Sequence, residues 1–98
     1  MNDLVIIWDD EDDPDGNFWH ICVDGHGLTR DEIEEVLRTD ESEIEVSRTS
    51  GRPTAFGWTS AGERIAVVFE EVSDDPRMMY PITAYIVPPK REKKRRKR

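Results

Sequence analysis

Few residues in this chain could perform acid–base or phosphate chemistry. Histidine exchanges protons readily, and the sequence has only His20 and His26. Arginine stabilises negative charge that develops on phosphate, and Arg48, Arg52 and Arg64 lie on or beside predicted strands. These residue types could serve a reaction in which one group removes a proton, another returns a proton, and a cation stabilises an anionic transition state.

Two tyrosines lie on the last predicted strand. Tyr80 and Tyr85 are five residues apart, so in a strand without a bulge they point to opposite faces. The same alternation places Tyr85 with Pro81 and Thr83, and Tyr80 with Ala84. Pro81 suits the beginning of this strand, where no ladder donor is needed.

Metal-binding patterns are weak in this sequence. His20 and His26 with Asp24 have no established zinc spacing, and the single Cys22 is too few for a cysteine-based site. The acidic segment 9–16 resembles a calcium loop only in its charge, since it lacks the full ligand frame that ends in glutamate. We therefore predict no metal and no cofactor, and we interpret Cys22 as a small buried hydrophobe.

The charge is divided between an acidic body and a basic tail. The whole chain has 14 Lys and Arg and 22 Asp and Glu, a net charge of −8. Residues 90–98 hold eight of the basic residues and one acidic residue, which leaves six and 21 in residues 1–89, a net charge of −15. Such asymmetry indicates an interaction tail, and its lack of apolar residues predicts disorder. The predicted nucleic-acid-binding residues are Lys90, Arg91, Lys93, Lys94, Arg95, Arg96, Lys97 and Arg98.

The length of the chain allows one small domain, predicted at residues 1–89, with the basic tail at 90–98. The sequence has no run of 18 apolar residues for a membrane span and no pattern of a secretory signal at its N-terminus. With a single cysteine, these features lead us to expect a cytoplasmic protein.

The clearest local signal is that of a helix at 30–38. Thr29 is a good N-cap and Glu32 follows three residues later, which completes a capping box. Leu28 before the cap and Ile33 within the helix can form a hydrophobic staple. A second, short helix is predicted upstream, where apolar residues fall at i, i+3 and i+4. It spans residues 17–24.

The other elements are predicted strands, in chain order 4–8, 44–48, 53–59, 64–70 and 80–87. The strand at 64–70 is the most apolar and is expected at the centre of the sheet, with Ile65, Val67 and Phe69 on one side. The order is β-α-α-β-β-β-β, and hairpin-length connections predict an α+β fold with a mostly antiparallel sheet and a helix pair packed on one face. Residues 73–77 are predicted as a loop, and Trp8 and Trp58 as core aromatics.

Several short motifs follow one another in a characteristic order. The first half contains Trp8-Asp9, Asn17, His26-Gly27-Leu28-Thr29, Glu32 and Glu35-Val36. The second half contains Gly57, Thr59, Gly62, Arg64 ahead of Val67-Val68-Phe69, and the strand Pro81-Ile82-Thr83-Ala84-Tyr85. In this order and spacing, over roughly residues 5–87, the chain resembles the BrnT family of toxins.

The resemblance implies a RelE-like fold and a type II toxin that cleaves RNA without a metal. It also implies a cognate antitoxin of the ribbon-helix-helix, DNA-binding type, with operator DNA bound by the complex. Arg64 matches the family's position on its apolar strand, and Tyr85 stands where the family has an arginine. On this basis the candidate catalytic residues are Arg64, Tyr85, His26 and Arg48.

Three hypotheses remain open at this stage. The chain is a toxin ribonuclease, a non-catalytic relative that binds a protein partner, or a nucleic-acid-associated module whose only contact is the tail at 90–98. Arg64 and the overall match favour the first. Tyr85 in place of arginine and the acidic body favour the second, because a body of net charge −15 repels RNA.

Overall fold

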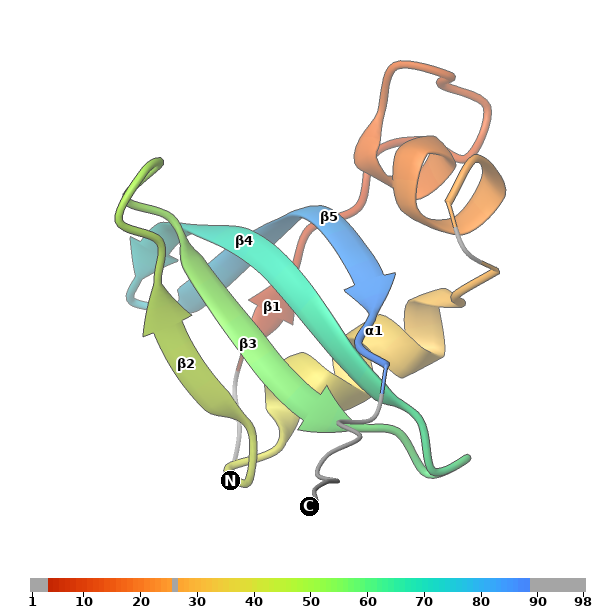
Figure 1. Cartoon of the computed structure of the whole chain (residues 1–98). Coiled ribbons are helices and arrows are strands. Elements are labelled where there is room, and N and C mark those ends of the chain that lie inside the picture. The colour runs from red at the N-terminus through yellow and green to blue at the C-terminus, as the bar shows by residue number, and fades with distance from the viewer. Residues whose placement is uncertain (1–3, 26, 89–98) are drawn as a thin grey trace.

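The computed structural model of the protein describes residues 4–25 and 27–88. Its elements, in chain order, are β1 (Val5–Ile6), η1 (Trp19–Val23), α1 (Arg30–Arg38), β2 (Glu43–Val46), β3 (Pro53–Trp58), β4 (Arg64–Asp74) and β5 (Arg77–Ile86). The strands form one sheet in the order β1-β5-β4-β3-β2 (Figure 1). β1 is parallel to β5 and all other neighbours are antiparallel. The predicted α+β fold with a mostly antiparallel sheet is confirmed, and β4 is its central strand.

The start of α1 is fixed by the capping box that the sequence predicts. The Thr29 hydroxyl oxygen accepts a hydrogen bond from the Glu32 N–H at 3.2 Å, and the Glu32 carboxylate accepts one from the Thr29 N–H at 3.0 Å. Leu28 and Ile33 are both buried in the same core cluster, as a hydrophobic staple requires. The helix therefore begins and ends where the sequence predicts, at Arg30 and Arg38.

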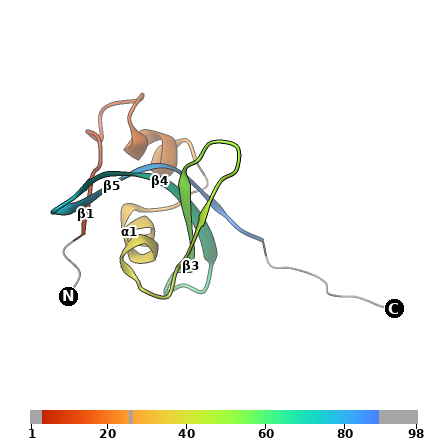
Figure 2. The same ribbon diagram turned by 90° about the vertical axis from the view of Figure 1, so that its left-hand side faces the viewer.

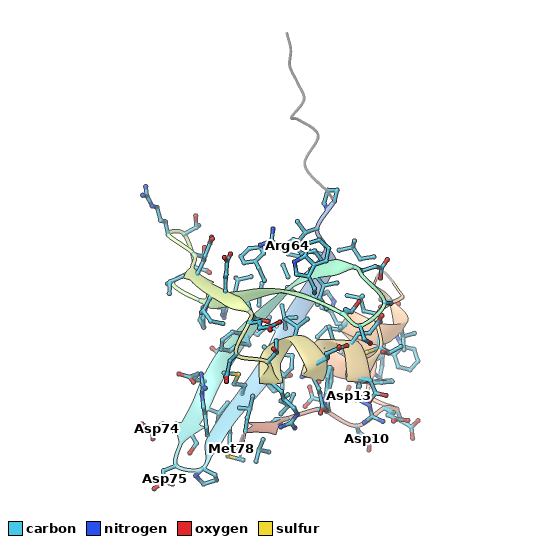
Figure 3. The ribbon with its side chains drawn as sticks, turned by 90° about the horizontal axis from the view of Figure 1, so that it is seen from below. Asp10, Asp13, Arg64, Asp74, Asp75 and Met78 are labelled. Atoms are coloured by element: carbon cyan, nitrogen blue, oxygen red, sulfur yellow. The ribbon has the colours of Figure 1, made fainter. Side chains whose placement is uncertain are left out.

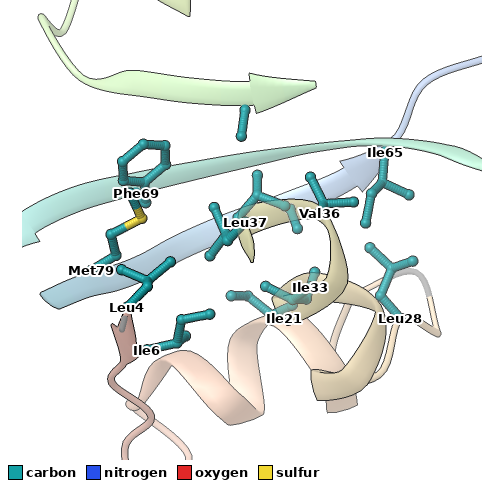
Figure 4. Close-up of a cluster of buried hydrophobic side chains, with 13 residues drawn as sticks. Leu4, Ile6, Ile21, Leu28, Ile33, Val36, Leu37, Ile65, Phe69 and Met79 are labelled. Carbon is teal, nitrogen blue, oxygen red and sulfur yellow. The ribbon is translucent and has the colours of Figure 1, made fainter. Parts of the chain in front are cut away.

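The core lies between α1 and one face of the sheet. Ile65, Val67 and Phe69 point from β4 to this face and are at most 2% exposed. α1 contributes Ile33 and Val36, which are fully buried. Figure 2 shows α1 beneath β4 and β5, and Figure 4 shows the side chains of Ile33, Val36, Ile65 and Phe69 in the buried cluster.

A glycine on β3 lets the end of α1 approach the sheet closely. A Cβ atom at Gly57 would collide with the Ser42 hydroxyl oxygen and would lie 3.1 Å from a methyl group of Val36. The Ser42 hydroxyl in turn donates a hydrogen bond to the Val36 carbonyl at 2.7 Å, which ties the chain after α1 to its last turn. The close approach thus depends on the missing side chain of Gly57.

The first helical segment is a π-helix that lies beside the sheet. η1 contacts β5 along the part of its edge that β1 leaves unpaired, as Figure 1 shows. Its Ile21 is 1% exposed and reaches the core, and Cys22 packs there while partly buried. A helix lies within the predicted segment 17–24, at Trp19–Val23. The predicted helix pair on one face is wrong in arrangement, because only α1 packs across a face.

The predicted bounds of the first strand and the predicted loop at 73–77 are also wrong. The first strand spans only Val5–Ile6, and Val5 is 40% exposed. The predicted loop at 73–77 is a tight turn, because β4 runs to Asp74 and β5 starts at Arg77. No helix within the described ranges is long and apolar enough to cross a membrane.

A β-bulge in β5 decides which face each tyrosine occupies. Thr83 pairs with Val68 and Pro81 pairs with Phe69, so Ile82 is an extra residue in β5. The bulge shifts the alternation by one, and Tyr80 and Tyr85 therefore share a face instead of pointing to opposite faces. It also accommodates Pro81, which lies inside the strand and not at its predicted beginning.

The packing of β4 generates a stability prediction. Val67→Asp should unfold the domain, because an unpaired carboxylate in the core costs several kcal/mol against a total stability of roughly 5–10 kcal/mol. Val72→Asp places the same charge on the same strand at a side chain that is 57% exposed, and should leave the unfolding midpoint nearly unchanged. Urea denaturation measures both, and a near-native midpoint for Val67→Asp would contradict the assigned face.

Candidate functional site

The face of the sheet opposite α1 is the open face. Within the described residues no helix crosses it, and Figure 1 looks onto it. Residues that pair directly across the strands share a face, so the pairing assigns its members. They are Glu43 and Glu45 on β2; Thr54, Phe56 and Trp58 on β3; Arg64, Ala66, Val68 and Glu70 on β4; and Tyr80, Thr83 and Tyr85 on β5.

Two arginines, Arg48 and Arg64, belong to the predicted catalytic set. Arg64 lies on β4 and points to the open face. Its guanidinium carbon lies 5.5 Å from the centre of the Phe56 ring, a cation–π contact. Its Nη2 atom is 3.6 Å from a Glu43 carboxylate oxygen. The side chain is 32% exposed, so the guanidinium is held in place yet remains open to an anion.

A surface pocket of about 410 Å³ lies beside Arg64, at the end of the sheet where β3 turns into β4. Its lining residues are Trp58, Gly62, Glu63, Arg64, Ile86, Val87 and Pro88. The N–H of Val87 donates to the carbonyl of Arg64 at 2.8 Å, which holds the chain after β5 against this wall. Figure 3 shows Arg64 at the end of the sheet opposite to Asp74 and Asp75.

A row of polar side chains extends from Arg64 along β5. Tyr85 pairs with Ala66 and is therefore a diagonal neighbour of Arg64, and its side chain is 42% exposed. Thr83 follows two residues away on the same face. Its hydroxyl lies 3.1 Å from Nε2 of His20, which reaches over from η1. The row thus begins with a cation and ends with an imidazole.

Tyr80 lies on the same face but is held by a hydrogen-bond network. Its hydroxyl donates to the Asp9 carboxylate at 2.5 Å, and the Asn17 N–H donates to the same carboxylate oxygen at 2.8 Å. The Tyr80 hydrogen bond is the main cause that lowers the pKa of Asp9, and the same bond raises the pKa of Tyr80 to about 12. A hydroxyl that holds its proton so firmly is a poor general base.

Asn17 locks the acidic loop to the sheet. Its side chain is 2% exposed, accepts from the Asp9 N–H at 2.8 Å, and donates to the carbonyls of Ile7 and Pro81 at 3.0 and 2.9 Å. All polar atoms of the amide therefore have partners, as a buried amide requires. The network explains why residues 9–17 and η1 stay beside β5.

The structure brings together two of the four predicted catalytic residues. Arg64 and Tyr85 are neighbours on the open face. Arg48 lies in the turn between β2 and β3, at the opposite end of β3 from Arg64, which is roughly 20 Å for six strand residues. Its inclusion in one site with Arg64 is therefore wrong. His26 and the tail at 90–98 lie outside the described residues.

Two residues of this site were not predicted from the sequence. Trp58 was assigned to the core, but its side chain is 63% exposed. The pattern could have shown this, because the small Ala55 and Gly57 mark the helix-packed face of β3 and Trp58 has the opposite parity. The contact of His20 with Thr83 joins segments 63 residues apart, and no local signal could have found it.

Comparisons of the chain with family models, with curated proteins and with solved structures gave no match. Among the described residues, no three or more His, Cys, Asp or Glu side chains gather in a group that could hold a metal ion. The function therefore has to be argued from the geometry of the open face and from the resemblance in the sequence.

The Asp9 network predicts a pH-dependent stability difference. Tyr80→Phe should lower the free energy of unfolding by about 1 kcal/mol at neutral pH, because a hydrogen bond to a charged, partly exposed acceptor is lost. A carboxylate with a lowered pKa stabilises the fold above its ordinary pKa of 3.8, and this contribution is lost as pH falls through the lowered value. Urea titrations should therefore show the difference shrinking in acid. A difference that stays constant with pH would reject the role of Asp9.

Proposed function

We propose that the protein is a BrnT-type toxin that cleaves RNA on the open face and is neutralised by a ribbon-helix-helix antitoxin. The single observation that carries the proposal is the row of side chains on the open face of β5, where Tyr85, paired with Ala66, neighbours Arg64, and Thr83 contacts His20. A cation, a phenol and an imidazole then follow one another along one exposed strand face. The order of the elements and the mostly antiparallel sheet support the RelE-like topology that this proposal includes.

The proposed reaction needs no metal. The 2′-oxygen of a ribose attacks the adjacent phosphorus, and the bond from phosphorus to the 5′-oxygen breaks, which leaves a cyclic phosphate and a free 5′-hydroxyl. In the proposal, His20 accepts the proton of the 2′-hydroxyl, and Tyr85 donates a proton to the leaving oxygen. Arg64 stabilises the extra negative charge of the phosphorane.

In the proposal, the basic tail and not the acidic body provides the affinity for RNA. The body has a net charge of −15, and Arg64 shares the open face with Glu43, Glu45 and Glu70. Such a surface attracts no polyanion by itself. Residues 90–98 add a net charge of about +7 and begin two positions after Pro88, which lines the Arg64 pocket. In the proposal, the tail holds RNA close to the site.

The second candidate is a non-catalytic relative that binds a protein partner. It is favoured by the contact between Arg64 and Glu43, because a guanidinium that already neighbours a carboxylate is less available to phosphate. The exposed Trp58 and Ile86 beside it are residue types that protein interfaces bury. This candidate predicts binding without RNA cleavage.

Arg64→Ala separates the two candidates. For an active ribonuclease we expect cleavage to fall by roughly 10²-fold or more, the scale of losing one transition-state contact. Induction of the wild-type chain in bacteria should arrest growth and degrade RNA, and induction of the variant should do neither. The melting temperature should change little, since the contacts of this partly exposed arginine are weak.

Arg77→Ala is the matched control. Arg77 is also an exposed arginine in an ion pair, 2.8 Å from Glu71, but it lies beside the turn at the far end of the sheet. Its removal should leave toxicity and RNA cleavage unchanged. Intact RNA and normal growth on induction of the wild-type chain would reject the ribonuclease and leave the protein-binding candidate. Equal cleavage by Arg64→Ala would remove Arg64 from the site.

A further inference from the structure

The pocket beside Arg64 has an aromatic wall that the proposed chemistry does not use. Trp58 is 63% exposed although it is the largest side chain on the open face, and Ile86 nearby is 37% exposed. The volume of about 410 Å³ lies within the range of small-molecule sites. An exposed indole next to a guanidinium offers a flat apolar surface and a positive charge side by side.

The charge around the pocket indicates what kind of partner fits it. Arg64 and Glu63 both line it, so the excess positive charge comes from the tail at 90–98, into which the chain continues after Pro88 of the pocket wall. The tail begins two positions after Pro88 in the sequence, so its eight basic residues are covalently linked to one wall of the pocket. A partner that carries flat apolar groups on a negatively charged backbone matches both features.

We propose that the Trp58 pocket binds an unpaired base of a single-stranded nucleic acid, while Arg64 contacts its phosphates. The inference rests on the proposed function and deepens it, because it names single-stranded RNA as the form of the substrate. In a duplex the base faces are stacked on one another, and only an unpaired base can present its face to the indole. A protein partner at the pocket is the competing occupant.

The test measures binding without cleavage. The full chain is titrated against a labelled strand of about 12 nucleotides, made as 2′-O-methyl RNA so that no 2′-hydroxyl can attack, as DNA of the same sequence, and as the duplex. We expect Trp58→Ala to weaken binding of both single strands by roughly tenfold or more, the scale of losing one stacked base. Duplex binding should stay unchanged. If the RNA and DNA single strands bind equally well, the protein recognises bases and phosphates only. If RNA binds more tightly, the protein also contacts the ribose.

Salt dependence separates the pocket from the tail. Stacking involves no released counterions, so Trp58→Ala should leave the slope of log affinity against log salt unchanged. Deletion of 90–98 should flatten that slope and keep the preference for single strands. Trp58→Phe retains an aromatic face and should keep most of the affinity. Val46→Ala is the control, because Val46 is 65% exposed but lies on β2 at the far end of β3 from the pocket.

The outcomes distinguish this inference from the proposed function. Trp58-dependent binding of single strands by a chain that cleaves no RNA would support the inference and reject the ribonuclease. RNA cleavage with unchanged strand affinity in Trp58→Ala would reject the inference and keep the ribonuclease. Failure of the wild-type chain to bind single strands at low salt would also overturn the inference and leave a protein as the occupant of the pocket.

Discussion

The pairing of β4 with β5 holds both the core and the open face in place. On one side, Ile65, Val67 and Phe69 on β4 are buried against α1, so the register of the pair cannot slip by one residue without exposing all three. On the other side, the bulge at Ile82 turns Tyr80 to the face that Tyr85 occupies. This bulge therefore decides that both tyrosines of β5 lie on the open face.

The two faces of β3 show how the sequence divides packing from exposure. Ala55 and Gly57 lie toward α1, and the absence of a side chain at Gly57 lets Ser42 and Val36 approach the strand. The large Phe56 and Trp58 consequently lie on the open face, where Phe56 packs under the Arg64 guanidinium. Small residues on the helix side and aromatic residues on the open side are two consequences of one close helix–sheet contact.

Local signals in the sequence were sufficient for the elements but not for the site. The capping box at Thr29 and Glu32 predicted α1 to the residue, because its partners are three positions apart. The apolar run of β4 predicted the centre of the sheet, because this run is also a pattern of neighbouring residues. Opposite faces for Tyr80 and Tyr85 were predicted for a strand without a bulge, and the bulge puts both on one face. The bulge depends on how β5 pairs with β4 around Pro81, and it leaves no mark in the alternation of one strand. The prediction of Arg48 in one site with Arg64 failed, because Arg48 lies at the opposite end of β3. The spacing of two arginines in the sequence does not show at which end of the sheet each one lies.

The charge distribution limits how the open face could act on RNA. Exposed charges further apart than about 10 Å are largely screened at ordinary salt, so the distant carboxylates of the body alter contacts at the site little. At close range the balance is set by Arg64 against Glu43, at 3.6 Å. A phosphate that displaces Glu43 forms an ion pair with the guanidinium of Arg64. The displacement breaks no buried ion pair, because both side chains are partly or largely exposed. Affinity from the tail and from stacking on Trp58 would then be needed to hold a strand long enough for Arg64 to exchange its carboxylate for phosphate.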